Sequence, residues 1–557
     1  MDFYREILDY MKEKKPGKKD LAKKKILLCK KHGLKDIPTD IEILLNAEKE
    51  ELQEIKNLLI TKPGRTGSGV AVVAIMSHPF KCPHGECAMC PSHTDENVPQ
   101  SYTGKEPASM RGGRNDFDPY LQVMNRLEQY IVTGHSPEKI ELIIMGGTFM
   151  SFDPLYKRDF VYFAFKAMND FSKMFYKDGE IDLSSFKDFF QLPGEIGSDE
   201  RTNSIRDKLL KLKNKNTTLE DEKKQNEDSN VRCVGLTLET RPDYGKLEHA
   251  KEMLEFGCTR VELGVQSVYD DALEAIERGH TVMDSVESTR ILKDLGFKIN
   301  YHVMPGLPGV SFQKDIEGFR ELFDNPDFRP DMLKIYPCMV LKNTKLHKKW
   351  QDGDFTPLTT QEASRIIREF KEYIPDYVRV MRVQRDIPTY ATQAGVDRTN
   401  LRQLINNEGH NCRCIRCREP GPKYLKSGKV PGTPKLHVHK YEASGGVEFF
   451  ISMETDDVLL GFLRMRFPSE ILHDGFTEKT AIIRELHVYG VLAGIGKEGA
   501  VQHKGYGRRL LEKAEEIAYE NEKNKMAVIS GVGVRGYYRK FGYSLEGPYM
   551  VKNINHD

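Results

Sequence analysis

Three cysteines lie close together in the segment KCPHGECAMCP. Cys82, Cys87 and Cys90 are separated by four and then two residues. Three thiolates at such spacing can each bind one iron of a [4Fe-4S] cluster, and the fourth iron is then open to an outside ligand. Zinc is the alternative, with His84 or His93 as a further ligand, although a structural zinc prefers four closed ligands. The segment predicts a metal centre, and the iron–sulfur interpretation leaves one position open.

A second cluster, CRCIRC, contains Cys412, Cys414 and Cys417, with His410 two residues before it. Soft ligands at this density in a linker rich in Gly and Pro predict zinc, because the metal replaces a core that the segment lacks. Free buried thiols are the alternative. His410 is the nearest fourth ligand, but a distant residue or a water molecule would also serve.

A glycine pattern opens an amphipathic helix in the segment QHKGYGRRLLEKAEEIA. Gln502, Gly505 and Gly507 form a Q-x-x-G-x-G arrangement. Glycines let the chain bring free N–H groups against a pyrophosphate, and the helix N-terminus adds partial positive charge. By itself a glycine pattern of this kind is a weak signal for a nucleotide-containing cofactor.

The elements that must position these residues follow from the hydrophobic pattern. Residues 1–65 carry apolar residues at helical spacing and predict a helical cap. Across residues 66–400, six short apolar runs alternate with amphipathic stretches, which predicts an α/β fold with a partial (β/α)6 barrel. The first cysteine cluster follows the first predicted strand, at the strand edge where such barrels carry their sites.

The rest of the chain has different patterns. Residues 210–230 are polar and of low complexity, so we expect a mobile insertion. Residues 401–435 form the cysteine-rich linker, and residues 436–557 predict a mixed α+β domain.

Composition limits the class of protein. The 557 residues are 39% hydrophobic and 30% charged, which is typical of a folded chain with two to four domains. No apolar run is long enough for a membrane span, so we expect a cytoplasmic protein without a membrane partner. The first 32 residues hold eleven Lys and Arg against five acids. This basic arm predicts contact with a polyanion, with a solvated surface as the alternative.

Several strand ends resemble the radical S-adenosylmethionine superfamily, although the cysteine spacing is one residue longer than the usual x3-x2. The matching segments are MGGTF, LETRPD, LGVQSVYDDALEAIERGHT and MPGLPG. The resemblance implies that S-adenosylmethionine binds the open iron. Gly146 and Gly147 would then lie against its amine, and Glu239, Gln266 and Arg278 would contact its ribose and carboxylate.

The C-terminal domain resembles GNAT-type acetyltransferases through the glycine pattern, the strand MAVISGVG and the segment RGYYRKFGY. The resemblance implies that acetyl-CoA binds at Gln502, Gly505 and Gly507, and along Glu485, Leu486, His487 and Val488 of RELHVYG. A tyrosine of the last helix would protonate the CoA thiolate, and Tyr537 and Tyr538 are the candidates. The alternative for either tyrosine is packing in the core.

A radical S-adenosylmethionine core joined to a GNAT domain resembles the family of the catalytic subunit of Elongator and its single-chain archaeal and bacterial relatives. The resemblance implies C5 carboxymethylation of the wobble uridine of tRNA from acetyl-CoA, with tRNA-stimulated acetyl-CoA hydrolysis and an electron donor. Lys334 and Tyr336, at the end of the sixth strand, would face the radical site.

Two other functions stay open: a protein or histone lysine acetyltransferase with a structural Fe–S cluster, and a tRNA-binding scaffold with degenerate sites. A homodimer or a larger complex is also open.

Overall fold

We describe residues 2–62, 66, 68–91, 94–194, 197–420, 432–456, 458–489 and 505–554 of a computed structural model. The backbone forms two compact units. The first consists of Met1–Val73, Pro119–Ile140 and Tyr162–Cys233, and the second contains the remaining residues. Each unit is described by itself.

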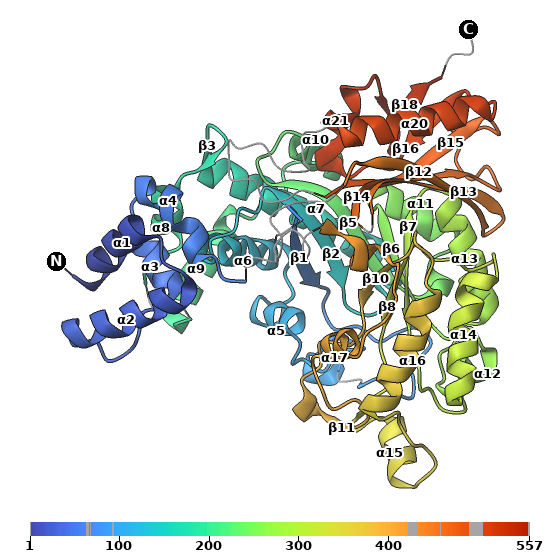
Figure 1. The fold of residues 1–557 in the computed structure, drawn as a ribbon, viewed down its shortest axis with the longest axis horizontal. Coiled ribbons are helices and arrows are strands. Elements are labelled where there is room, and N and C mark those ends of the chain that lie inside the picture. Colours follow the sequence, from blue (N-terminus) through green and yellow to red (C-terminus); the bar gives the residue numbers. More distant parts are fainter. Residues whose placement is uncertain are drawn as a thin grey trace. The chain divides into compact units, whose positions relative to one another are not determined.

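The first unit is mainly helical, as the apolar spacing near the N-terminus predicts (Figure 1). Ile7, Met11 and Ile43 are fully buried in a core that the first four helices share. Capping side chains start two of these helices, because Asp2 accepts from the Arg5 N–H and Thr39 forms a capping box with Glu42. The helices with most or all of their residues in this unit are α1 (Phe3–Lys14), α2 (Lys18–His32), α3 (Asp40–Asn46), α4 (Lys49–Leu59), α6 (Pro119–Val132), α7 (Pro154–Phe175), α8 (Leu183–Phe189), α9 (Asp199–Leu212) and α10 (Leu219–Asn226); β3 (Tyr176–Lys177) and β4 (Glu180–Ile181) form a hairpin.

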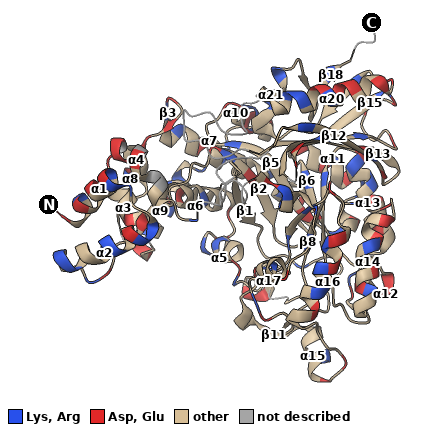
Figure 2. Cartoon of the chain, in the orientation of Figure 1, with Lys and Arg blue, Asp and Glu red and all other residues tan. Residues whose placement is uncertain are grey.

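The basic arm is folded, and part of its charge is paired within the first unit. Lys12 lies 2.6 Å from Glu51, and the buried Lys25 lies 3.1 Å from Asp40. The remaining lysines give α2 the Lys and Arg bands visible in Figure 2, and those with exposed side chains include Lys18, Lys19, Lys23 and Lys30.

The stretch 210–230, for which composition predicts a mobile insertion, is largely helical in the structure. It contains the end of α9 and the whole of α10, which begins with a capping box between Thr218 and Asp221. The Asn169 side chain donates to the Glu222 carboxylate at 2.7 Å, and Asn226 donates to Asn169 at 2.8 Å. Buried amide hydrogen bonds replace the apolar contacts that the sequence lacks, which is why composition alone is misleading here.

A seven-stranded sheet, most of whose residues lie in the second unit, has the strand order β1-β2-β5-β6-β7-β8-β10. Neighbours from β5 to β10 pair in parallel, so the predicted partial barrel is confirmed. The seventh strand, β10, was not among the six predicted. The strands are β1 (Ala71–Met76), β2 (Lys139–Met145), β5 (Arg232–Thr240), β6 (Arg260–Gln266), β7 (Lys298–Val303), β8 (Met332–Ile335) and β10 (Arg379–Arg382).

Helices and short strands complete this part of the second unit, and α14 packs on α16 through stacked Phe319 and Phe370 rings 4.2 Å apart. The helices are α5 (Pro107–Arg114), α11 (Leu247–Glu255), α12 (Asp270–Ala275), α13 (Val282–Asp294), α14 (Phe312–Asp324), α15 (Lys345–Gln351), α16 (Thr360–Tyr373), α17 (Leu401–Glu408) and α18 (Ile415–Arg418); β9 (Val340–Leu341) and β11 (Thr392–Ala394) pair with each other.

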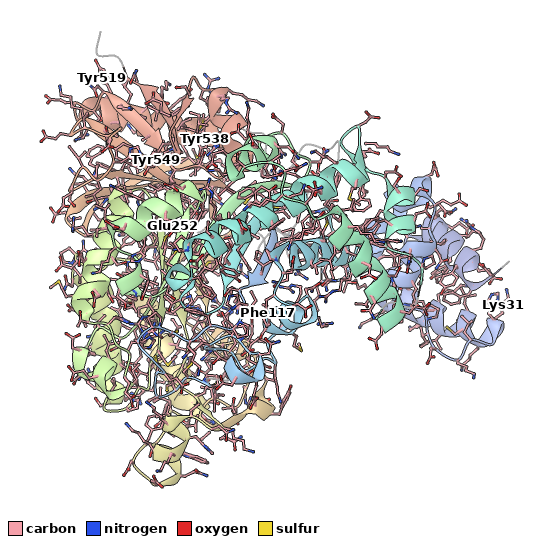
Figure 3. The ribbon with its side chains drawn as sticks, turned by 180° about the vertical axis from the view of Figure 1, so that it is seen from behind. Lys31, Phe117, Glu252, Tyr519, Tyr538 and Tyr549 are labelled. Carbon is pink, nitrogen blue, oxygen red and sulfur yellow. The ribbon has the colours of Figure 1, made fainter. Side chains whose placement is uncertain are left out.

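The C-terminal domain is the predicted mixed α+β domain. Its sheet has the order β12-β13-β14-β15-β16-β18-β17, with β15 and β16 parallel. Helix α20 covers one face, where Leu510 and Ala514 are fully buried. Figure 3 labels Tyr538 and Tyr549, whose rings are buried in this domain. The elements are β12 (Lys435–Ala443), β13 (Gly446–Thr455), β14 (Val458–Phe467), β15 (Thr480–Val488), α20 (Tyr506–Glu520), β16 (Lys525–Val528), α21 (Arg535–Arg539), β17 (Ser544–Glu546) and β18 (Tyr549–Asn553).

A buried ion network joins the C-terminal domain to the barrel within the second unit. Arg484 of β15 lies 2.6 Å from Asp331, which precedes β8, and 2.9 Å from Glu448 of β13. Arg466 of β14 lies 2.6 Å from Asp294 at the end of α13. All five side chains are fully buried.

None of the described helices combines the length and apolarity that a membrane crossing requires.

Candidate active site

An open cavity lies at the C-terminal ends of the barrel strands, within the second unit. Its volume is about 1200 Å³, including space open to solvent. The loop after β1 contributes all three cysteines of the first cluster, and the ends of the other strands contribute Gly147, Glu239, Gln266, Tyr336 and Arg382. The structure therefore brings most of the predicted barrel residues to one place.

The cysteine loop presents its thiols beside cationic and polar groups. The Cys87 Sγ lies 3.5 Å from the Arg278 guanidinium and 3.2 Å from the His84 Nε2. The Cys82 Sγ lies 3.6 Å from the Thr148 hydroxyl. His93, the other histidine considered as a zinc ligand, lies outside the described residues.

Burial makes the thiols of Cys82 and Cys90 hard to ionise without a nearby positive charge. It raises the pKa of the Cys90 thiol to about 12 and also raises the pKa of Cys82. Burial, together with the charges of Arg241 and Arg278, lowers the pKa of His84 to about 4. Because thiolates are the form that binds metals, this donor set suits a cationic metal centre.

Two glycines form the turn after β2. Gly146 has a φ of +124°, and a Cβ there would lie 2.1 Å from the Ser77 hydroxyl. Gly147 has a φ of +84°, and a Cβ there would lie 3.8 Å from the Cys82 Sγ. A side chain is thus excluded at Gly146, and Gly147 leaves its backbone open beside the cysteine loop.

The three residues expected to contact S-adenosylmethionine all line the cavity. Glu239 accepts from the Tyr102 hydroxyl at 2.9 Å. Gln266 ends β6 with a φ of +68°, and its buried Oε1 has no hydrogen-bond partner among the described residues. Arg278 donates to the Gly264 carbonyl at 2.8 Å and also reaches Cys87.

Lys334 lies in a buried charge cluster that the sequence analysis missed. Its ammonium group donates to the Glu262 carboxylate and lies 3.4 Å from Glu239. His302 lies 2.9 Å from the same Glu262 carboxylate. The available signal was the occurrence of charged residues at alternate positions of apolar strands, as in RVELG and NYHV.

The cluster keeps its charges despite its burial. Burial raises the pKa of Glu262, but the charge of Lys334 and the His302 hydrogen bond outweigh it, so the pKa lies well below its usual range. Burial lowers the pKa of Lys334, but the charges of Glu262, Tyr336 and Glu239 raise it by more, so the pKa lies above its usual value. Lys334 therefore presents a fixed positive charge to the cavity at neutral pH.

The second cysteine cluster has compact geometry. The sulfur atoms of Cys412, Cys414 and Cys417 all lie within 4.8 Å of one another, as the ligands of a single metal ion do. His410 is not part of this group, because its Nε2 lies 2.8 Å from Lys371 and 2.9 Å from Asn406. The Lys371 ammonium group lies 3.8 Å from the Cys417 Sγ and supplies positive charge to the thiols.

The C-terminal domain places its glycine pattern at the start of α20. Gly505 is the N-cap residue with a φ of +75°, and Gln502 lies outside the described residues. A Cβ at Gly507 would lie 2.6 Å from the Tyr537 hydroxyl, so that hydroxyl lies against the loop. Tyr538 is buried in the hydrophobic core, the alternative that the sequence left open for either tyrosine.

The end of β15 has a free edge. β15 pairs with β16 only from Thr480 to Ile483, although it continues to Val488. Glu485, Leu486, His487 and Val488 thus have backbone groups on that edge without a strand partner among the described residues, so an extended ligand can pair there. The Glu485 carboxylate accepts from Arg464 at 2.9 Å, and His487 stacks on Phe462.

Known families match the chain in four consecutive regions. Residues 1–67 match the ELP3 N-terminal domain, and residues 76–323 match the radical SAM superfamily. Residues 330–410 match the radical SAM C-terminal domain, and residues 423–543 match the acetyltransferase (GNAT) family.

Similar proteins extend over nearly the whole chain. The tRNA uridine(34) acetyltransferase of Methanocaldococcus infernus is 43% identical over 565 residues, covering 98% of each chain. Elongator complex protein 3 of Danio rerio is 39% identical, covering 96% of this chain and 93% of its own. The solved structure of Methanocaldococcus infernus Elp3 with an N-terminal deletion has a TM-score of 0.71 and 40% identity, covering 87% of this chain and 100% of its own. The chain therefore belongs to the Elongator Elp3 family, which combines a radical SAM domain with a GNAT domain.

Proposed function

We propose that this protein modifies the wobble uridine of tRNA, converting C5–H to a carboxymethyl group with acetyl-CoA as the carbon source. The proposal depends most on one observation: a single chain carries both the cysteine-lined barrel cavity and a GNAT domain with a free β15 edge. We infer the substrate from the relative named tRNA uridine(34) acetyltransferase, which aligns with this chain over 98% of each.

The barrel cavity suits a [4Fe-4S] cluster on Cys82, Cys87 and Cys90, with S-adenosylmethionine beside it. In support, the Cys87 thiol is buried next to Arg278, and the Gly146–Gly147 turn leaves open backbone beside Cys82. When bound, these groups supply a radical that can remove hydrogen from a carbon that acids and bases cannot activate. Glu239, Gln266 and Arg278 would bind and orient S-adenosylmethionine.

Lys334 and Tyr336 would position the reacting uracil. Both line the cavity, and the fixed positive charge of Lys334 suits a hydrogen bond to a uracil carbonyl. Glu262 would act as a positioning residue, because its carboxylate accepts from Lys334, and His302 would hold that carboxylate from 2.9 Å.

The GNAT domain would bind acetyl-CoA. The free edge between Glu485 and Val488 suits the pantetheine arm, and the Gly505–Gly507 loop suits the pyrophosphate. Hydrolysis of the thioester, which we expect tRNA to stimulate, breaks the C–S bond, and the departing thiolate then takes a proton. The Tyr537 hydroxyl, which lies at this loop, is the candidate donor.

The decisive experiment follows a hydrogen atom. The protein is incubated anaerobically with a chemical reductant, tRNA, S-adenosylmethionine and acetyl-CoA deuterated on its methyl group. We expect deuterium in 5′-deoxyadenosine and carboxymethyluridine in the tRNA. Cys87→Ala should abolish both, whereas Cys29→Ala, a buried cysteine outside both clusters, should change neither.

The same experiment separates the alternatives. Acetylation of protein lysines without cleavage of S-adenosylmethionine would identify a lysine acetyltransferase and exclude the proposal. Binding of tRNA with neither S-adenosylmethionine cleavage nor acetyl-CoA hydrolysis would identify a scaffold and also exclude it.

Cys412, Cys414 and Cys417 would bind one zinc ion. Metal analysis of the purified chain should show zinc in about equal amount to protein. Cys417→Ser should lower the zinc content and the melting temperature while leaving the iron content unchanged. Zinc-free protein of unchanged melting temperature would show that these residues are free thiols.

A further inference from the structure

Tyr390 presents an aromatic ring to solvent beside a positive charge. Its side chain is 72% exposed, although it lies on an ordered 3-10 turn, Thr389–Ala391. The Lys105 ammonium group lies 5.3 Å from the ring centroid, a cation–π distance. Strand β11 follows the turn directly and pairs with β9, so a paired strand anchors the end of the turn.

Neither Tyr390 nor Lys105 lines the barrel cavity, but chain neighbours of both do. Tyr102 and Glu106, on either side of Lys105, line the cavity, and so does Ile387, three residues before Tyr390. The Arg385 guanidinium donates to the Ser101 carbonyl and ties the two segments together. The exposed ring and its cation are therefore carried by two segments that also contribute residues to the cavity lining.

Tyr373 serves as a comparison for Tyr390, because it is also exposed and lies beside a cation. It is 53% exposed at the end of α16, with the Arg320 guanidinium 4.4 Å from its ring centroid. Its hydroxyl accepts from the same arginine at 2.8 Å, so the pair is satisfied internally. No residue within three positions of Tyr373 lines the barrel cavity, whereas Ile387 does so three positions before Tyr390. Exposure and a nearby cation are thus common to both tyrosines, and chain neighbours that line the cavity distinguish Tyr390.

We propose that Tyr390 and Lys105 form a base-stacking subsite for the nucleotide next to the target uridine in a single-stranded RNA loop. This inference rests on the proposed function. A base that enters the cavity leaves its stack, and its neighbour then loses a stacking partner. An exposed aromatic ring replaces that partner for any base, since every base has a π face. Lys105 adds a charge that suits the adjacent phosphate.

The test uses the full chain and an anticodon stem-loop RNA. Loss of one base stack should weaken binding by about 5- to 150-fold, so we expect this effect from Tyr390→Ala. Tyr390→Phe should bind like wild type because it keeps the ring. Tyr373→Ala is the matched control and should also bind like wild type.

An abasic RNA shows whether the contact is a base stack. Two abasic RNAs are compared, one lacking the base before the target uridine and one lacking the base after it. Wild type should bind one of the two more weakly than intact RNA, by the same factor that Tyr390→Ala loses on intact RNA. Tyr390→Ala should bind that abasic RNA no more weakly than the intact one. Equal binding of intact RNA by wild type and Tyr390→Ala would overturn the subsite. So would additive losses, in which Tyr390→Ala weakens the binding of each abasic RNA as much as it weakens the binding of intact RNA.

The test distinguishes failure of the subsite from failure of the proposed function. If wild type does not bind the stem-loop, or binds it without cleaving S-adenosylmethionine, the proposed function fails and the subsite with it. If wild type binds and modifies the RNA while Tyr390→Ala is unchanged, only the subsite fails.

Discussion

Lys334 depends on two carboxylates for its position in the cavity. Glu262 is fully buried on β6 and Glu239 is nearly so on β5, while Lys334 lies on β8. Removal of one partner from such a cluster leaves a buried charge without compensation. The cluster therefore links the stability of the barrel to the chemistry that we propose for it.

We expect Lys334→Met to destabilise the protein by about 3–5 kcal/mol, because the buried Glu262 then loses its nearest cation and keeps only Arg260, 3.5 Å away. Activity should fall about 100-fold or more, since the charge facing the uracil is lost. Thermal unfolding and the deuterium assay measure the two effects. Lys513→Met, at an exposed pair 2.7 Å from Glu516, is the control and should cost less than about 1 kcal/mol.

A second substitution tests the reason. Adding Glu262→Gln to Lys334→Met should recover most of the stability, because it removes the carboxylate charge that Lys334 had paired. It should recover none of the activity, because Lys334 is still absent. If stability is not recovered, the loss does not come from Glu262.

Asp315 gives the barrel a stability that depends on pH. Burial raises the pKa of its carboxyl group to about 7, against an unfolded value of about 4, although the Gly306 N–H donates to it at 2.8 Å. Between about pH 4 and pH 7 the folded state holds a proton that the unfolded state has released. Stability should therefore fall as the pH rises through this window, by on the order of 4 kcal/mol in total.

Asp315→Asn removes this titration, so its melting temperature relative to wild type should rise between about pH 5 and pH 8. Melting curves of both proteins at the two pH values check this. A constant difference between the two proteins would show that Asp315 has an ordinary pKa.

At the scale of elements, α10 shows how polar residues build a buried contact. The helix lies on α7 through Asn169, Glu222 and Asn226, whose side chains bond to one another. Asn226 also donates to the Val231 carbonyl at 3.0 Å and accepts from the Cys233 N–H at 2.8 Å. We expect the amides of α10 to exchange slowly with solvent, as those of an ordered helix do.

Asn226→Ala should speed that exchange and destabilise the protein by about 1–3 kcal/mol, because it leaves buried backbone groups unpaired. Hydrogen exchange resolved by peptide measures the effect. Asn203→Ala, on the exposed side of α9, should leave exchange in α10 unchanged. Fast exchange of α10 in the wild type would instead support the mobile insertion that its composition predicts.

At the scale of the whole molecule, buried arginines attach the C-terminal domain to the barrel. Asp331 accepts from Arg484 at 2.6 Å and also from the Ile299 N–H at 2.8 Å, so it belongs to both domains. Burial raises the pKa of Asp331, but the charges of Arg484 and Arg464 lower it by more. The pKa therefore lies below its usual value, and the carboxylate stays ionised. We expect the two domains to unfold together.

Asp331→Ala should separate these transitions, because Arg484 and Arg464 lose the carboxylate that pairs them with the barrel. The expected loss is about 3–5 kcal/mol. Scanning calorimetry should then show the C-terminal domain melting first. Glu512→Ala, at an exposed pair on α20, is the control and should keep one transition. A single unshifted transition in Asp331→Ala would show that Asp331 is not needed to couple the two domains.

The sequence allowed correct prediction of those features that depend on local spacing. Apolar runs of strand length predicted the first six strands of the barrel. Parallel strands are buried on both faces, so each is an unbroken run of hydrophobic residues. The cysteines of each cluster lie within a few residues of one another, so chain geometry alone brings them together. Strand β10 was missed, since RVMR is charged at both ends and reads as a surface segment.

By itself the sequence determined the family, the partial barrel, the mixed C-terminal domain and the two cysteine clusters, because each is encoded in residues close together in the chain. Only the tertiary structure decided which distant side chains meet. The pairing of Lys334 with Glu262 depends on strand register, and that of Lys105 with Tyr390 depends on where two loops end. Such contacts arise from packing across the fold, and no local pattern records them.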